Sequence, residues 1–144
     1  MLKDNLVMLR NLHGWSQEEI AEKIGISRQA YAKWERGTTV PDIEKCRLLA
    51  EVYGTTLDNL VSTGTVEGIG TFPPPPKGKS IWGSVIVNER GQIVIPKGAR
   101  DRYGFTEGRR LVVLGDETGI ALVRAEILEA GIKEALELMR TRAD

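Results

Sequence analysis

Three polar side chains in the first quarter of the chain carry hydrogen-bonding groups that match the edges of nucleotide bases. Arg28, Gln29 and Lys33 fall on one face of a helix that we expect to begin after Ser27, and Ala32 shares that predicted face. Arginine can donate two hydrogen bonds to guanine, and glutamine can pair with adenine in the same bidentate way. The spacing therefore predicts a surface that could read base pairs in a groove.

Four further residues are placed to contact a phosphate backbone. Gln17 and Ser27 stand at the N-terminal ends of two predicted helices, where side chains and free amide groups can meet phosphate oxygens. Arg36 and Thr38 follow the second of these helices and are expected to contact the backbone there. The alternative for the basic helix face is that it is an ordinary solvated surface.

The elements that position these side chains are predicted to form one helical domain over residues 1–62. Ser16 and Glu19, three positions apart, form a capping-box pattern. Gly25 then marks a tight turn, Ser27 caps the following helix, and Gly37 ends it. Hydrophobic spacing predicts further helices at three places: before residue 13, from Pro41 onward, and over residues 57–61.

The rest of the chain divides into three predicted parts. Residues 63–80 are a linker, because glycine, threonine and four consecutive prolines favour a stiff segment between flexible flanks; a partner-binding proline motif is the alternative. Residues 81–126 show short apolar runs separated by turn residues, which predicts a small, mainly β domain. Its expected strands are 85–87, 93–95, 111–114 and 120–123, and its expected helix is 97–103. Residues 127–144 are predicted to form an amphipathic C-terminal helix.

The predicted β domain is too small to be stable by itself. Short strands and one helical turn in about 45 residues make a poor core, and such domains usually need a disulfide, a metal or a partner. The apolar runs are continuous rather than alternating, which implies burial on both faces. We therefore expect a two-fold homodimer formed through residues 81–126.

The N-terminal residues closely resemble the Cro/phage-repressor helix-turn-helix family. The matching elements are Leu9-Arg10, Gly14 to Ala21, Ile26 to Gln29, Trp34 to Gly37, Pro41-Asp42 and Leu49-Ala50. The resemblance extends over residues 6–60 and implies an all-α, five-helix DNA-binding domain with an internal ion pair between Arg10 and Glu35. It assigns base contacts to three residues and a backbone contact to a fourth: Arg28, Gln29 and Lys33, and Gln17.

A second resemblance covers residues 82–124 and is to the AbrB/SpoVT-like swapped-hairpin domain. It is carried by Val85 to Lys97, by Arg100, by Tyr103-Gly104-Phe105 and by Glu107-Gly108. Such domains form intertwined homodimers, and many bind DNA through basic residues on one face. Arg90, Lys97 and Arg100 are therefore candidates for a second DNA face, although Gln92 stands where family members often have arginine. The alternative, slightly favoured, is a domain that only dimerises.

The composition limits what else the chain can do. It has 20 basic and 20 acidic residues, so DNA binding must come from a local basic face. One cysteine, Cys46, and one histidine, His13, are too few for a zinc site, and we expect neither metal nor cofactor. No phosphate loop or nucleophile–base pair indicates an enzyme. Without a signal segment or a long apolar run, we expect no membrane association and a cytoplasmic, nucleoid-associated protein.

The sequence thus predicts a multidomain regulator of bacterial transcription that binds double-stranded DNA as a homodimer. A single reading helix binds weakly, and pairing of two chains makes the second binding event intramolecular. We expect an inverted-repeat operator and repression of a promoter. The alternative function is an antitoxin, in which the C-terminal helix binds a toxin and the chain regulates its own operon.

Overall fold

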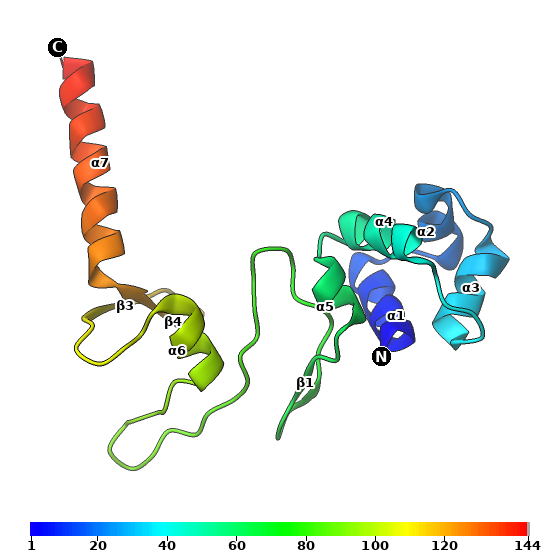
Figure 1. Cartoon of the computed structure of the whole chain (residues 1–144), viewed down its shortest axis with the longest axis horizontal. Helices are drawn as coiled ribbons and strands as arrows, with labels where there is room; N and C mark the ends of the chain where they lie inside the picture. The colour runs from blue at the N-terminus through cyan, green and yellow to red at the C-terminus, as the bar shows by residue number, and fades with distance from the viewer. Residues whose placement is uncertain (144) are drawn as a thin grey trace. The chain divides into compact units, whose positions relative to one another are not determined.

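The computed structural model describes residues 1–143 and divides into two compact units, Met1–Ile86 and the chain from Val87 onward (Figure 1). The first unit is helical, and the second combines a small β hairpin with a final helix, as the sequence predicts. The last position of the expected C-terminal helix, Asp144, lies outside the described residues. Among the described residues, no helix is long and apolar enough to cross a membrane.

The first unit contains the five predicted helices, each ended by local signals in the sequence. They are α1 (Leu2–His13), α2 (Gln17–Ile24), α3 (Arg28–Arg36), α4 (Ile43–Tyr53) and α5 (Leu57–Val61). Glycines with positive φ follow each of the first four, a conformation that glycine adopts without steric cost. The fourth helix begins later than predicted, because Asp42 and not Pro41 precedes its first turn and its side chain accepts from Lys45 N at 2.8 Å.

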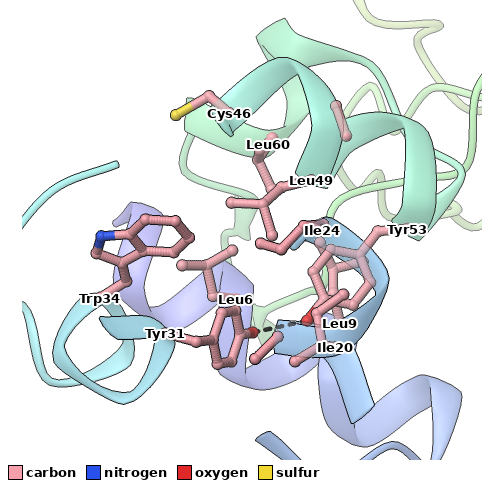
Figure 2. Packing of buried hydrophobic residues seen from close by; sticks show 12 residues of the cluster. Leu6, Leu9, Ile20, Ile24, Tyr31, Trp34, Cys46, Leu49, Tyr53 and Leu60 are labelled. Atoms are coloured by element: carbon pink, nitrogen blue, oxygen red, sulfur yellow. Dashed lines mark hydrogen bonds between the residues drawn. The ribbon is translucent and has the colours of Figure 1, made fainter. Parts of the chain in front are cut away.

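A single hydrophobic core holds these helices together. Figure 2 shows side chains from all five helices converging, among them Leu6, Leu49 and Leu60, which are fully buried. Each fully buried leucine stabilises the fold by about 1.5–3 kcal/mol relative to exposure. Trp34 and Tyr31 of α3 enter the same core, so the orientation of α3 is fixed by packing.

The predicted linker contains more structure than its composition indicated. β1 (Thr65–Val66) and β2 (Gly70–Thr71) pair in antiparallel register, with Thr65 opposite Thr71 and Val66 opposite Gly70. Val66 is buried, and the proline run that follows returns to the helical core.

The second unit is built around one antiparallel hairpin. Its elements are α6 (Lys97–Tyr103), β3 (Leu111–Gly115), β4 (Ile120–Arg124) and α7 (Ala125–Ala143). The turn between the strands is closed by the Asp116 carboxylate, which accepts from the amides of Thr118 and Gly119 at 2.8 and 3.2 Å. Leu111 pairs with Arg124, and the register continues to Gly115 and Ile120.

Two of the four predicted strands are absent from the single chain. Residues 85–87 and 93–95 have no strand assignment, although Asn88 N donates to Gln92 O at 3.0 Å in the turn between them. The side chains of Ile86 and Val94 are 92% and 76% exposed. An isolated two-stranded ribbon is marginally stable without a hydrophobic surface to cover it, and within residues 1–143 these two runs stay largely exposed.

Candidate nucleic-acid interface

The turn between α2 and α3 is set by short-range hydrogen bonds that the sequence specifies. Ser16 Oγ accepts from Glu19 N at 3.1 Å, and the Glu19 carboxylate accepts from Ser16 N at 2.7 Å. This is the predicted capping box, and it fixes the start of α2. Gly25 then turns the chain with φ 74°, and Ser27 Oγ caps α3 by accepting from Ala30 N at 3.1 Å.

The outward face of α3 presents the three predicted base-contacting residues to solvent. Arg28, Gln29 and Lys33 are exposed, whereas Tyr31 and Trp34 lie in the core on the other side. Ala32 was predicted to share the outward face, and that prediction is wrong, since its side chain is only 8% exposed. The reason is that α3 packs against both α1 and α2, so the covered arc is wider than one stripe.

The predicted backbone-contacting residues differ in how much hydrogen-bonding capacity is open to solvent. Arg36 and Thr38 are exposed at the C-terminal end of α3. Ser27 uses its hydroxyl to cap the amide of Ala30, which leaves the amides of Arg28 and Gln29 without an acceptor inside the helix. Gln17 is half-buried, and its amide nitrogen donates to Glu35 Oε2 at 3.0 Å.

Glu35 is the centre of a polar network that ties three helices together. Arg10 of α1 donates from Nε to Glu35 Oε1 at 2.6 Å and from Nη2 to Oε2 at 3.1 Å. The ion pair that the family resemblance implied is thereby confirmed. Burial opposes ionisation of Glu35, but hydrogen bonds from Arg10 and Gln17 outweigh it and lower the pKa of the carboxyl group. Glu35 is therefore an internal counter-ion and not a surface charge that would repel phosphate.

Comparison with known proteins agrees with this geometry. The sequence profile described as helix-turn-helix matches residues 6–60. The uncharacterized HTH-type transcriptional regulator MJ0272 of Methanocaldococcus jannaschii is 30% identical over 59 residues, which cover 41% of this chain and 89% of that protein. The chain belongs to the helix-turn-helix family. The profile match lies wholly in the first unit, so it describes the helix-turn-helix domain and not residues 87–143.

Two further similarities cover the same share of the chain. The cryptic phage CTXphi transcriptional repressor RstR of Vibrio cholerae is 36% identical over 62 residues, covering 43% of this chain and 56% of that protein. A crystal structure of SinR, the master regulator for biofilm formation, in complex with DNA aligns with a TM-score of 0.41 and 24% sequence identity. The alignment covers 43% of this chain and 100% of that chain. The chain spans between 29% and 56% of the length of RstR and four other bacterial relatives.

Sequence reasoning missed a basic residue beside the end of α3. A Cβ atom added at Gly37 would lie 2.9 Å from Cδ of Lys3, so the Lys3 side chain lies against the turn that carries Arg36 and Thr38. No local spacing could reveal this, because the contact joins the first turn of α1 to the far end of α3 in the helix-turn-helix domain. Lys3 adds a cation to the proposed backbone-contacting side.

A buried tyrosine pair was also missed. The hydroxyl groups of Tyr31 in α3 and Tyr53 in α4 are 2.6 Å apart (Figure 2). Burial raises the pKa of both tyrosines, and that of Tyr53 reaches about 12, so both hydroxyls are neutral at physiological pH. Helical spacing placed both rings inward, but it could not show that their polar ends meet. This hydrogen bond joins α3 to α4.

The candidate second DNA face is partly engaged within the chain. Lys97 Nζ forms an ion pair with Asp101 at 3.0 Å, and Arg100 Nε donates to Ile95 O at 3.0 Å. Arg90 is exposed in the turn that precedes residues 93–95. In the part of the chain that the structure describes, no three His, Cys, Asp or Glu side chains are grouped as a metal site would need.

Proposed function

We propose that this chain is a sequence-specific DNA-binding regulator of transcription that acts as a homodimer. The observation that carries the proposal is the exposure of Arg28, Gln29 and Lys33 on the face of α3 opposite its core side, within a helix-turn-helix domain. The first part of α3 enters the major groove, where Arg28 and Gln29 have the bidentate geometry suited to guanine and adenine. As a DNA-binding regulator the protein acts at the nucleoid.

Backbone contacts fix the register of α3 on the duplex. The first-turn amides after Ser27, the side chain of Gln17 and the exposed Arg36 and Thr38 surround the reading face and reach phosphates on either side of it. The Gln17 amide is oriented by Glu35, which leaves its side-chain oxygen to accept and its second N–H to donate outward. Because the net charge is 0, this local arrangement supplies the attraction to DNA.

Dimerisation depends on an AbrB/SpoVT-like swapped-hairpin domain over residues 81–126, which includes most of the second unit. Residues 63–80 are the connection to the helix-turn-helix domain, and residues 127–144 are the predicted C-terminal helix. Residues 85–87 and 93–95 have strand-forming sequences but no paired strand in one chain. Apolar side chains stay exposed in both runs and on the hairpin, including Ile86, Val94, Val113 and Ile120. Strands contributed by a second copy would cover them and complete the sheet.

A dimer of this kind binds an inverted-repeat operator and represses the promoter that contains it. Each domain reads one half-site, and the second binding event gains from the effective concentration that the linkage provides. The similarity to RstR, which is named a transcriptional repressor, supports repression rather than activation.

Selection of bound duplexes from a random pool by the intact chain tests the function. We expect a motif with two-fold symmetry, and its positions in the source genome should lie in promoters. Gln29→Ala should relax the preference at one base position in each half-site, while Glu18→Ala, on the exposed surface of α2, should select the same motif as the unaltered chain. A pool without enrichment contradicts the proposal.

The dimer has its own test. Val94→Asp places a charge in a run that the proposed interface buries, and sedimentation should show a shift from dimer to monomer. Ile69→Asp, which changes a side chain of the first unit that is 66% exposed against 76% for Val94, should leave the dimer intact. If the unaltered chain is a monomer at micromolar concentration, the dimer proposal is wrong.

A second DNA face on this unit is the less favoured part of the proposal, because two of its three residues have partners within the chain. We infer that the unit dimerises without touching DNA. Replacing Arg90, Lys97 and Arg100 together by alanine should leave both the affinity and its salt dependence unchanged. A reduced salt slope would assign these residues to phosphate contacts.

The antitoxin alternative rests on the C-terminal helix. Ile132, Leu136 and Met139 form a stripe on α7 and are more than half exposed, which is a surface that a partner protein could cover. Co-expression with a small neighbouring gene should then yield a second polypeptide that co-purifies with this chain. Leu136→Asp should abolish that co-purification and preserve operator binding, whereas a chain that never retains a second polypeptide excludes the antitoxin role.

A further inference from the structure

The segment between α5 and residue 77 folds back onto the helix-turn-helix domain. We call residues 63–77 the return segment. Gly64 O accepts from Phe72 N at 2.7 Å, which closes the base of the β1–β2 hairpin, and a Cβ at Gly64 would lie 2.9 Å from Phe72 O. The hairpin therefore reverses the chain and directs the proline run toward the helices.

Hydrogen bonds from the domain hold the far end of the return segment. Pro75 O accepts from Thr55 Oγ1 at 2.7 Å and from Asn59 Nδ2 at 3.4 Å, and Thr55 is only 5% exposed. Lys77 N donates to Gly54 O at 2.8 Å, at the C-cap of α4. Pro74, between these points, is buried. The prolines have a fixed φ, so little chain entropy opposes this docking.

Hydrogen bonds also hold the start of the return segment, where the chain leaves α5. Asn5 of α1 is 2% exposed, and its Nδ2 donates to Leu60 O at 2.7 Å and to Ser62 O at 2.8 Å. These bonds fix the exit of the chain from α5. The return segment is thus anchored at both ends to the domain that carries α3, and it belongs to that domain rather than to a free linker.

Docking shortens the free connection between the two units. With Lys77 anchored and the proposed dimer domain starting at residue 81, the free connection is residues 78–80, which reaches at most about 10 Å when fully extended. A connection that ran freely from residue 63 to residue 80 would reach about 60 Å. Ser84 Oγ also donates to Glu67 O at 3.0 Å, which holds the chain just after the connection against the β1–β2 hairpin.

We propose that the docked return segment makes Thr55 and Asn59 determinants of operator geometry, because they restrict the spacing between half-sites that one homodimer can span. This inference rests on the proposed function. A short connection holds the two reading helices within a narrow range of separations, and a shift of about five base pairs moves one half-site to the opposite side of the duplex. A long connection would tolerate that shift, at the cost of a lower effective concentration.

The test compares affinities of the intact chain for duplexes that carry the selected half-sites at their preferred spacing and with five base pairs inserted. The unaltered chain should lose at least about tenfold on the shifted duplex, because it forfeits avidity. The double variant Thr55→Val with Asn59→Ala removes both donors to Pro75 O. Pro74→Asp places a charge at a buried position, which should release the return segment from the domain. For each of these two variants, the affinities for the preferred and the shifted duplex should differ by no more than about threefold. Thr63→Val changes an exposed threonine and should behave as the unaltered chain.

Two further measurements separate the possible failures. Hydrogen exchange at the Lys77 amide should be slow in the unaltered chain and fast in both undocked variants; rapid exchange in the unaltered chain overturns the proposal without reference to DNA. Six glycine and serine residues inserted between Ser80 and Ile81 should restore tolerance of the shifted duplex with the return segment still docked. Unchanged spacing preference in all lengthened or undocked variants also overturns it. If no variant or parent binds any duplex, the proposed function itself fails.

Discussion

Neutralising Glu35 should destabilise the helix-turn-helix domain far more than neutralising a surface carboxylate. The side chains of Arg10 and Glu35 are 18% and 6% exposed, and Glu35 accepts hydrogen bonds from Arg10 Nε, Arg10 Nη2 and Gln17 Nε2. In Glu35→Gln the shape is kept, but the Arg10 charge loses its partner away from water. Breaking a buried pair from one side costs about 3–5 kcal/mol, and we expect about 3 kcal/mol because one carbonyl acceptor survives.

Urea unfolding of the intact chain, followed by the amide signals of α3, measures this loss. Glu44→Gln is the matched control, because Glu44 pairs with Arg47 on the exposed surface of α4 and its removal should leave the unfolding midpoint unchanged. The double variant Arg10→Met with Glu35→Gln should be more stable than the sum of the single losses predicts, since no unpaired charge remains. Additive losses, or equal effects of Glu35→Gln and Glu44→Gln, would refute the reasoning.

The same pair predicts a pH dependence of defined sign. Arg10 and Gln17 lower the pKa of Glu35 in the folded state against the opposing effect of burial. A lowered carboxyl pKa contributes stability that is present above the unfolded value of about 4.5 and is lost as the pH falls through the folded pKa. The free energy of unfolding should therefore fall below about pH 4.5, and Glu35→Gln should have a shallower slope there.

Other substitutions test separate parts of the structure. Gly104→Ala should destabilise the second unit by about 1–2 kcal/mol in thermal unfolding, because the residue has φ 69° and the new Cβ would approach Arg124 Nη1 at 3.3 Å. Gly131→Ala, in open space on α7, should stabilise by about 0.5–1 kcal/mol, and equal signs for the two changes would contradict this account. Tyr53→Phe removes the buried hydrogen bond between the two tyrosine hydroxyls and should cost about 0.5–1.5 kcal/mol in urea unfolding. The pKa of Tyr53 is raised from 10.0 to about 12, so the unaltered chain should lose stability between those pH values, and Tyr53→Phe should lose less.

The sequence alone could predict what short-range hydrogen bonds and hydrophobic spacing determine. The capping box at Ser16, the turn at Gly25 and the cap at Ser27 involve residues within three positions of each other, and the structure contains all of them. The Arg10–Glu35 pair is a long-range contact, and only the family resemblance revealed it. Ala32 was misplaced because spacing gives the direction of a side chain but not the width of the arc that its neighbours cover.

The features that sequence could not predict depend on distant parts of the chain or on a second chain. Proline content indicated a stiff segment, but docking of Pro75 on Thr55 requires the fold of α4 and α5 to be known. Lys3 meets Gly37 only because α1 packs against α3, which are far apart in the sequence. The runs at 85–87 and 93–95 have the composition of strands, but a strand needs a neighbour to pair with, and composition does not say which molecule supplies it.

We propose above all that the outward face of α3 distinguishes one base sequence from another. The most direct measurement is the affinity of the intact chain and of Arg28→Ala for the selected duplex and for a scrambled duplex of the same length and composition, at one salt concentration. We expect Arg28→Ala to lose about 1–3 kcal/mol of binding free energy on the selected duplex and much less on the scrambled one. Equal losses on both duplexes would show that Arg28 only attracts phosphate, and the claim that α3 reads bases would be contradicted.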